Sequence, residues 1–163
     1  MNEFFSYLAK TIIKTFSGKN IFAHLLAFAL TAIIVLSGFD WYYFTHLKNL
    51  GSSYFLFPAV ILGGIVPIVV PVYLLATSIL KKNNERKGLG MSLAVSAVAG
   101  SIISSFYKSL TGRIQPDRGN LLLDISHQFN FGFMKHGFFW GWPSSHTTIA
   151  FAMAFTLITL FPK

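Results

Sequence analysis

Charged residues are scarce in this sequence, and cysteine is absent. Asp, Glu, Lys and Arg make up 11% of the 163 residues, whereas a soluble domain carries roughly a quarter. Hydrophobic residues make up 53%, and 18 of the residues are Phe. Without cysteine there is neither a disulfide framework nor a thiolate metal site. The missing charge indicates that lipid surrounds most of the chain, and it predicts a polytopic α-helical membrane protein.

Acidic residues are fewer than basic ones, which gives a formal net charge of +8. A basic balance is compatible with a nucleic-acid partner. The cations, however, gather at the ends of apolar segments, where they orient a membrane protein. We therefore expect membrane lipids, and no nucleic acid, as partners.

The hydropathy pattern predicts one all-α membrane domain over residues 1–163, with about four spans. Residues 1–19 form an amphipathic N-terminal arm with Phe5, Leu8, Ile12 and Phe16 on one face. This arm either lies in the headgroup layer or extends the first span. The remaining segments are the spans at about 21–39, 54–80, 89–107 and 147–161 and an outer loop at 108–146.

Three local features qualify these spans. His24, near the start of the first span, is expected to face the lipid headgroups, and the aromatic run 41–44 is typical of a membrane interface. The second span contains prolines, which predict either a tilted, kinked helix or a broken helix that lines a site. They are Pro58, Pro67 and Pro71.

The distribution of cations predicts the orientation of the bundle. The N-terminal arm and the segment 81–88 are rich in Lys and Arg, whereas the segment between the first two spans has Lys48 opposed by Asp40. The positive-inside rule places the N-terminus in the cytoplasm and the loop 108–146 outside it. The cations in this loop do not follow the positive-inside rule, which indicates that they have a function other than setting the orientation.

Two clusters bracket the outer loop. Lys108, Arg113 and neighbouring residues follow the third span, and such cations supply charge and forked donors for phosphate. Ser144, Ser145 and His146 open the fourth span, where a helix N-terminus presents unpaired N–H groups and a histidine can transfer a proton. Each cluster also has a simpler interpretation when it is taken alone. The cations would anchor the chain to lipid phosphates, and the serine would be an ordinary helix N-cap.

Together, the clusters resemble the type 2 phosphatidic acid phosphatase superfamily. Its first motif is Lys, six residues, then Arg-Pro, which Lys108 and Gln115-Pro116 resemble. Its second motif is Pro-Ser-Gly-His at the start of a helix, which residues 143–146 resemble. The resemblance covers about the second half of the chain and implies a six-helix membrane phosphatase of which this chain is the N-terminal part. It also implies that no cofactor and no metal are needed.

The sequence departs from the family pattern in ways that bear on activity. Gln115 stands where the family has Arg, and Arg113 is a candidate replacement; Ser145 stands where the family has Gly. The third motif, which in the family supplies the nucleophilic histidine, its orienting aspartate and another arginine, does not occur in these residues. We therefore expect a C-terminally incomplete form that depends on a further segment or another subunit.

The resemblance implies a membrane lipid-phosphate phosphatase that hydrolyses phosphomonoesters or pyrophosphates through a phosphohistidine, and we expect it in a bacterial inner membrane. His146 would be the catalytic acid, and the substrate-binding residues would be Lys108, Arg113, Gln115, Ser144 and Ser145. The alternative is a non-catalytic membrane protein that retains an anion-binding outer loop, and a third class is a small transporter component. His127 and His136 also lie in the outer loop, where no partner is spaced to activate either of them, and are expected to be solvated.

Overall fold

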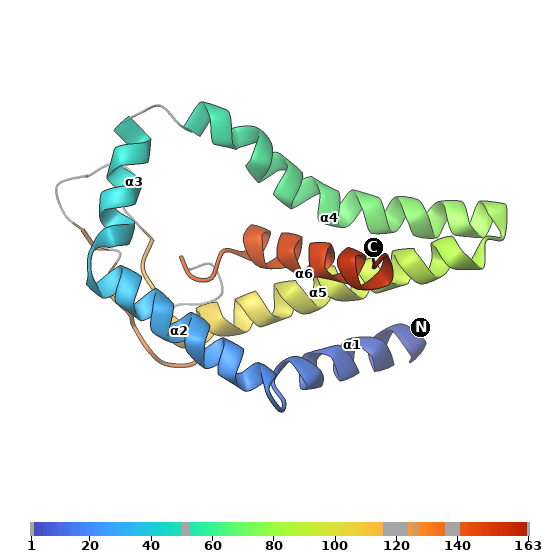
Figure 1. Cartoon of the computed structure of the whole chain (residues 1–163), viewed down its shortest axis with the longest axis horizontal. Coiled ribbons are helices and arrows are strands. Elements are labelled where there is room, and N and C mark those ends of the chain that lie inside the picture. Colours follow the sequence, from blue (N-terminus) through green and yellow to red (C-terminus); the bar gives the residue numbers. More distant parts are fainter. Residues whose placement is uncertain (1, 50–52, 116–123, 126, 136–140, 163) are drawn as a thin grey trace. The chain divides into compact units, whose positions relative to one another are not determined.

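The described part of the chain is helical throughout its regular structure (Figure 1). The computed structural model describes residues 2–49, 53–115, 124–125, 127–135 and 141–162, and no strand occurs within them. Their elements are α1 (Asn2–Thr15), α2 (Asn20–Leu36), α3 (Phe39–Asn49), α4 (Ser53–Lys81), α5 (Asn84–Thr111) and α6 (Ser145–Leu160). The predicted all-α class is confirmed.

The longest helices have the length and composition of membrane spans. Residues 57–81 of α4 and the whole of α5 are apolar over enough turns to cross a bilayer. A third span results if α1 and α2, which meet at a bend of 64°, are counted together. The 16-residue α6 is apolar but shorter. The chain is thus a helical membrane bundle, and the count of four spans stays a prediction.

Helix α4 continues without a break from Ser53 to Lys81, despite its three prolines. The prediction of a broken helix is therefore wrong, and the tilted, kinked helix stays a prediction. Pro67 and Pro71 are buried, whereas Pro58 is exposed. Only 11% of the most apolar stretch of α4 is buried inside the protein, as expected for a helix that faces lipid along much of its length.

One compact unit comprises residues 1–14, 59–103 and 144–163. In it, Leu8 of α1 packs against Val95 and Ala99 of α5, with Phe4 and Ile12 beside it. The face of α1 that packs on α5 thus contains Phe4, Leu8 and Ile12, whereas Phe5 of the predicted apolar face is 59% exposed. The periodicity was compatible with either phenylalanine, because both neighbour the same helical face.

Helices α5 and α6 of this unit approach closely through small and polar side chains. The hydroxyls of Ser96 and Thr156 lie 2.6 Å apart and share a hydrogen bond. A side chain at Gly100 would lie 3.3 Å from the Cα of Ile149, so glycine allows the two backbones to come together. Ser96 pairs with a late residue of α6 and Gly100 with an early one, which makes the helices antiparallel.

The second compact unit comprises residues 15–58 and 104–143. His24 is half-buried within it and makes hydrogen bonds with its neighbours, and its position at the headgroups stays a prediction. Its Nε2 lies 3.0 Å from the carbonyl oxygen of Thr15, its Nδ1 lies 2.8 Å from the hydroxyl of Tyr107, and its ring stacks on Phe16. Because a carbonyl oxygen only accepts, Nε2 of His24 is the donor in its hydrogen bond to Thr15.

The aromatic run 41–44 belongs to α3, a separate helix. Gly38 ends α2 with a φ of 71°, a left-handed conformation that glycine adopts without strain. Helix α3 then begins at Phe39 with Asp40 in its first turn. Asp40 therefore lies at the start of α3, where it contacts the candidate site residue Arg113.

Candidate functional site

The second motif forms the N-terminus of α6. Ser144 is the N-cap, with φ −66° and ψ 119°, and its Oγ accepts a long hydrogen bond of 3.4 Å from the N–H of Thr147. Its carbonyl oxygen accepts from the N–H of Thr148 at 2.9 Å. The simpler reading of Ser144 as a helix cap is therefore confirmed. The same geometry presents the first-turn N–H groups of α6, which favour a negative charge.

His146 lies in the first turn of α6, with its ring against two glycines of α4. A methyl group at Gly64 would lie 3.2 Å from His146 Nε2 and 3.3 Å from its Cδ2. At Gly63, it would lie 3.6 Å from His146 Cβ. His146 is nevertheless exposed, because its ring forms part of a cavity wall.

This cavity has a volume of about 410 Å³ and lies among α4, α5 and α6 of the first unit. Its polar lining comes from Ser101, Ser145 and His146. From Gly63 it follows α4 to Val72, a stretch of about 13 Å at the helical rise. Gly90 of α5 lies against Leu74 and Leu75 of α4, so the two helices run antiparallel from the turn that joins them. The polar residues of the cavity therefore lie together at the end near Gly63 and Gly64. The other end is apolar.

The first motif begins on a helix instead of in a loop. Helix α5 continues to Thr111, so Lys108 lies half-buried in its last turn. The predicted start of the outer loop at residue 108 is therefore too early, because Thr111 is still helical despite its low helix propensity. Gly112 ends the helix with a φ of 49°, and a side chain there would lie 2.5 Å from the carbonyl oxygen of Asn130.

Backbone hydrogen bonds fix the segment that follows α5. The N–H of Ile114 donates to the carbonyl of Gln128 at 3.2 Å, and the N–H of Gly141 donates to that of Arg113 at 2.9 Å. Gln115 is exposed, and its Cγ lies 3.3 Å from where a side chain at Gly141 would begin. These contacts give Arg113 and Gln115 defined positions.

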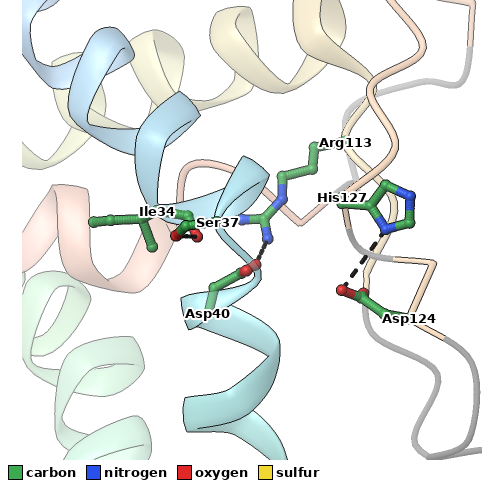
Figure 2. A network of polar contacts seen from close by, with 6 residues as sticks. All are labelled: Ile34, Ser37, Asp40, Arg113, Asp124 and His127. Atoms are coloured by element: carbon green, nitrogen blue, oxygen red, sulfur yellow. Dashed lines mark hydrogen bonds and ion pairs between the residues drawn. The ribbon is translucent and has the colours of Figure 1, made fainter.

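Arg113 already has a carboxylate partner within its own unit. Figure 2 shows its guanidinium directed at Asp40 of α3, with which it forms an ion pair. It also lies 6.0 Å from the ring centre of Phe129. The side chains of Arg113 and Asp40 are only 13% and 19% exposed, so water screens the pair weakly. Asp40 Oδ1 is buried and lacks a hydrogen-bond partner among the described residues.

His127 also has a neighbour that the sequence analysis overlooked. Its Nδ1 lies 3.7 Å from Oδ2 of Asp124, beyond hydrogen-bond distance, and its side chain is 52% exposed (Figure 2). The i, i+3 spacing of Asp124 and His127 was a signal that could have been used. His136 lies outside the described residues.

The predicted site residues are divided between the two units. Lys108, Arg113 and Gln115 belong to the second, whereas Ser144, Ser145 and His146 belong to the first. Their meeting in one site stays a prediction. Within the part of the chain that the structure describes, no three or more His, Cys, Asp or Glu residues gather as metal ligands.

Comparison with known proteins gives a match for the part of the chain that contains the two motifs. Residues 89–163 match the family model of the PAP2 superfamily, the type 2 phosphatidic acid phosphatases. A comparison with curated proteins found no match, and neither did a comparison with solved structures. The match includes Lys108 and residues 143–146, so it confirms the resemblance that these motifs carried. The similarity to the PAP2 superfamily thus extends over residues 89–163.

Proposed function

We propose that the chain contributes the phosphate-binding and acid-catalytic part of a membrane lipid-phosphate phosphatase. The observation that carries this proposal is the place of His146, in the first turn of α6 and at the polar end of a cavity whose other end is apolar. A helix N-terminus beside a titratable imidazole suits a phosphate ester whose leaving oxygen needs a proton. The family of residues 89–163 is one of phosphatases.

The family mechanism implied by the motifs transfers the phosphoryl group in two steps. A histidine nitrogen attacks phosphorus, the bond to the lipid oxygen breaks, and His146 gives that oxygen its proton. A water molecule, deprotonated by His146, then attacks the phosphohistidine, and the N–P bond breaks to release phosphate. Lys108 and the first-turn N–H groups of α6 would stabilise the phosphate oxygens. The attacking histidine belongs to the third motif, which these residues lack.

The cavity supports a lipid as the substrate. Beyond Gly64, its apolar stretch along α4 from Pro67 to Val72 is about 7.5 Å long at the helical rise and suits part of a hydrocarbon chain, and its polar groups are confined to the end that contains His146. A phosphorylated lipid has the same division between a charged head and a hydrocarbon body. Phosphatidate, phosphatidylglycerophosphate, polyprenyl pyrophosphate and lipid A all meet this description.

The cation distribution supports a site that faces away from the cytoplasm. Lys81, Lys82, Arg86 and Lys87 lie in or beside the turn between α4 and α5. This turn would be cytoplasmic under the positive-inside rule. The opposite ends of these helices, and with them the start of α6, would face the outer side of a bacterial inner membrane.

The proposal is tested by lipid binding to the purified chain in nanodiscs. Fluorescent lysophosphatidate should bind more tightly than the monoacylglycerol with the same acyl chain, because only the first has a phosphate. His146→Ala and Lys108→Ala should each reduce this difference by about 1–3 kcal/mol, the cost of a lost charged hydrogen bond. Equal binding of both lipids would reject the phosphate site.

A non-catalytic anion-binding protein is the second candidate, and the Arg113–Asp40 pair favours it. Gln115 is uncharged, and the charge of the nearby Arg113 is compensated by Asp40. Both observations reduce the positive charge available to a transition state. This candidate predicts phosphate-dependent lipid binding without turnover, even after the third motif is supplied in a longer chain.

A further inference from the structure

We propose that Gly64 is a positioning residue that holds the imidazole of His146 in its working orientation. This inference rests on the proposed function, in which His146 is the acid. A methyl group at residue 64 would lie 3.2 Å from Nε2 and 3.3 Å from Cδ2. Both separations are shorter than a comfortable carbon contact of about 3.5–4.0 Å. The edge of the ring therefore occupies the space that the absent side chain leaves.

The backbone of α4 gives no other reason for a glycine at this position. Gly63 and Gly64 lie inside the continuous helix Ser53–Lys81, and neither has a positive φ. Glycine lowers the stability of a helix interior relative to alanine. The pair is therefore best explained by what packs against it, and His146 is the described side chain in contact with both residues.

The two glycines differ in what they contact on His146. A methyl group at Gly63 would make an ordinary contact of 3.6 Å with Cβ, which stays in place when the ring turns. At Gly64, the contact is with the far edge of the ring, and relief requires rotation about the side-chain torsions. The missing side chain at Gly64 thus lets the edge of the ring that bears Nε2 lie against α4, whereas Gly63 accommodates only the base of the side chain.

The orientation of the His146 ring matters because the ring lies at the polar end of the cavity. Ser101 and Ser145 share the polar end of the cavity with His146, and the remaining lining of α4 below Gly64 is apolar. A ring displaced from α4 would move further into this space and expose Nε2. An acid must hold its proton within hydrogen-bond reach of the leaving oxygen. The space beside Gly64 allows the ring to take this position against α4.

The test compares Gly64→Ala with the matched control Gly63→Ala. The purified chain is treated with diethyl pyrocarbonate at fixed pH, and carbethoxylation of His146 is followed by peptide mass spectrometry. Gly64→Ala should raise the rate constant at His146 by roughly two- to tenfold, the equivalent of one strained side-chain torsion. Gly63→Ala should leave it unchanged, and His127 serves as an internal reference. Equal rate constants at His146 in all three proteins would overturn the proposal.

A second measurement applies if Gly64→Ala folds poorly. Its melting temperature should be lower than that of the wild type, but the same substitution in a His146→Ala background should be neutral or stabilising, because no ring remains to be displaced. An equal shift in both backgrounds would overturn the proposal. Protection of wild-type His146 by orthovanadate tests the proposed function separately. Its absence would reject the phosphate site and leave the comparison of Gly64 with Gly63 intact.

Discussion

The guanidinium of Arg113 forms an ion pair with the carboxylate of Asp40, 73 residues earlier in the chain. The cation that was the candidate replacement for the family arginine therefore has a counterion within its own unit. A phosphate would have to compete with Asp40 for this charge. The pair also joins α3 to the segment that follows α5.

Removing the negative charge of Asp40 should strengthen phosphate binding. In Asp40→Asn, the guanidinium of Arg113 keeps a polar neighbour but loses its counterion, so an external anion gains about 1–3 kcal/mol of interaction. Vanadate or phosphate titration of the purified chain measures this gain. Unchanged affinity would mean that Arg113 does not contribute to the anion site.

Replacing Arg113, the other partner of this ion pair, should reduce the stability of the protein. Arg113→Ala leaves the largely buried carboxylate of Asp40 uncompensated, which should lower the free energy of unfolding by about 1–3 kcal/mol. Thermal denaturation in detergent gives this difference. Adding Asp40→Asn to Arg113→Ala should recover much of the loss. A double variant as unstable as Arg113→Ala would assign the effect to other contacts of Arg113.

The Ser96–Thr156 hydrogen bond should make a small contribution to the packing of α5 on α6. Thr156→Val keeps the shape of the side chain and removes the bond, with an expected loss of about 0.6 kcal/mol, typical of such pairs between membrane helices. Thr159→Val is the matched control, because the Thr159 hydroxyl bonds to Phe155 of its own helix. A double-mutant cycle with Ser96→Ala isolates the pairwise energy, and a coupling of zero would contradict the prediction.

Cysteine labelling can test the proposed orientation cleanly, because the chain has no cysteine of its own. In intact cells, an impermeant maleimide should modify Ile125→Cys and spare Glu85→Cys. Labelling of both after the cells are lysed controls for accessibility. The opposite pattern would place the start of α6 on the cytoplasmic side.

Residues 1–163 alone should show no appreciable lipid phosphatase activity, because in the proposed function His146 would be the acid and the nucleophile would come from the third motif. A radiolabelled lipid-phosphate assay measures this. Joining the chain to a segment with the third motif should restore turnover, and His146→Ala should then reduce it by roughly 10²–10⁴-fold. Turnover by the chain alone that survives His146→Ala would refute the assignment and direct attention to His127 and Asp124.

The sequence was sufficient to predict the helical segments of α1, α2, α4 and α5 and the start of α6, because hydrophobic periodicity and serine caps are local signals, but it did not predict α3 as a separate helix. Contacts between distant residues carry no such signal. Nothing in the pattern around His24 indicated Tyr107 as its partner. Asp40 was used only as evidence for the orientation of the bundle, and not as a partner of Arg113. The position of Gly64 beneath the His146 ring also depends on how α4 packs against α6.

The boundary of a recognised family need not coincide with the boundary of a piece that folds. The match begins at residue 89, yet residues inside it depend on residues before it. Val95 packs on Leu8, Tyr107 bonds to His24, and Arg113 pairs with Asp40. Excising 89–163, or grafting that range into a relative, would strip each of these residues of its partner. Exchanges of segments with other members of the superfamily should therefore include the N-terminal helices.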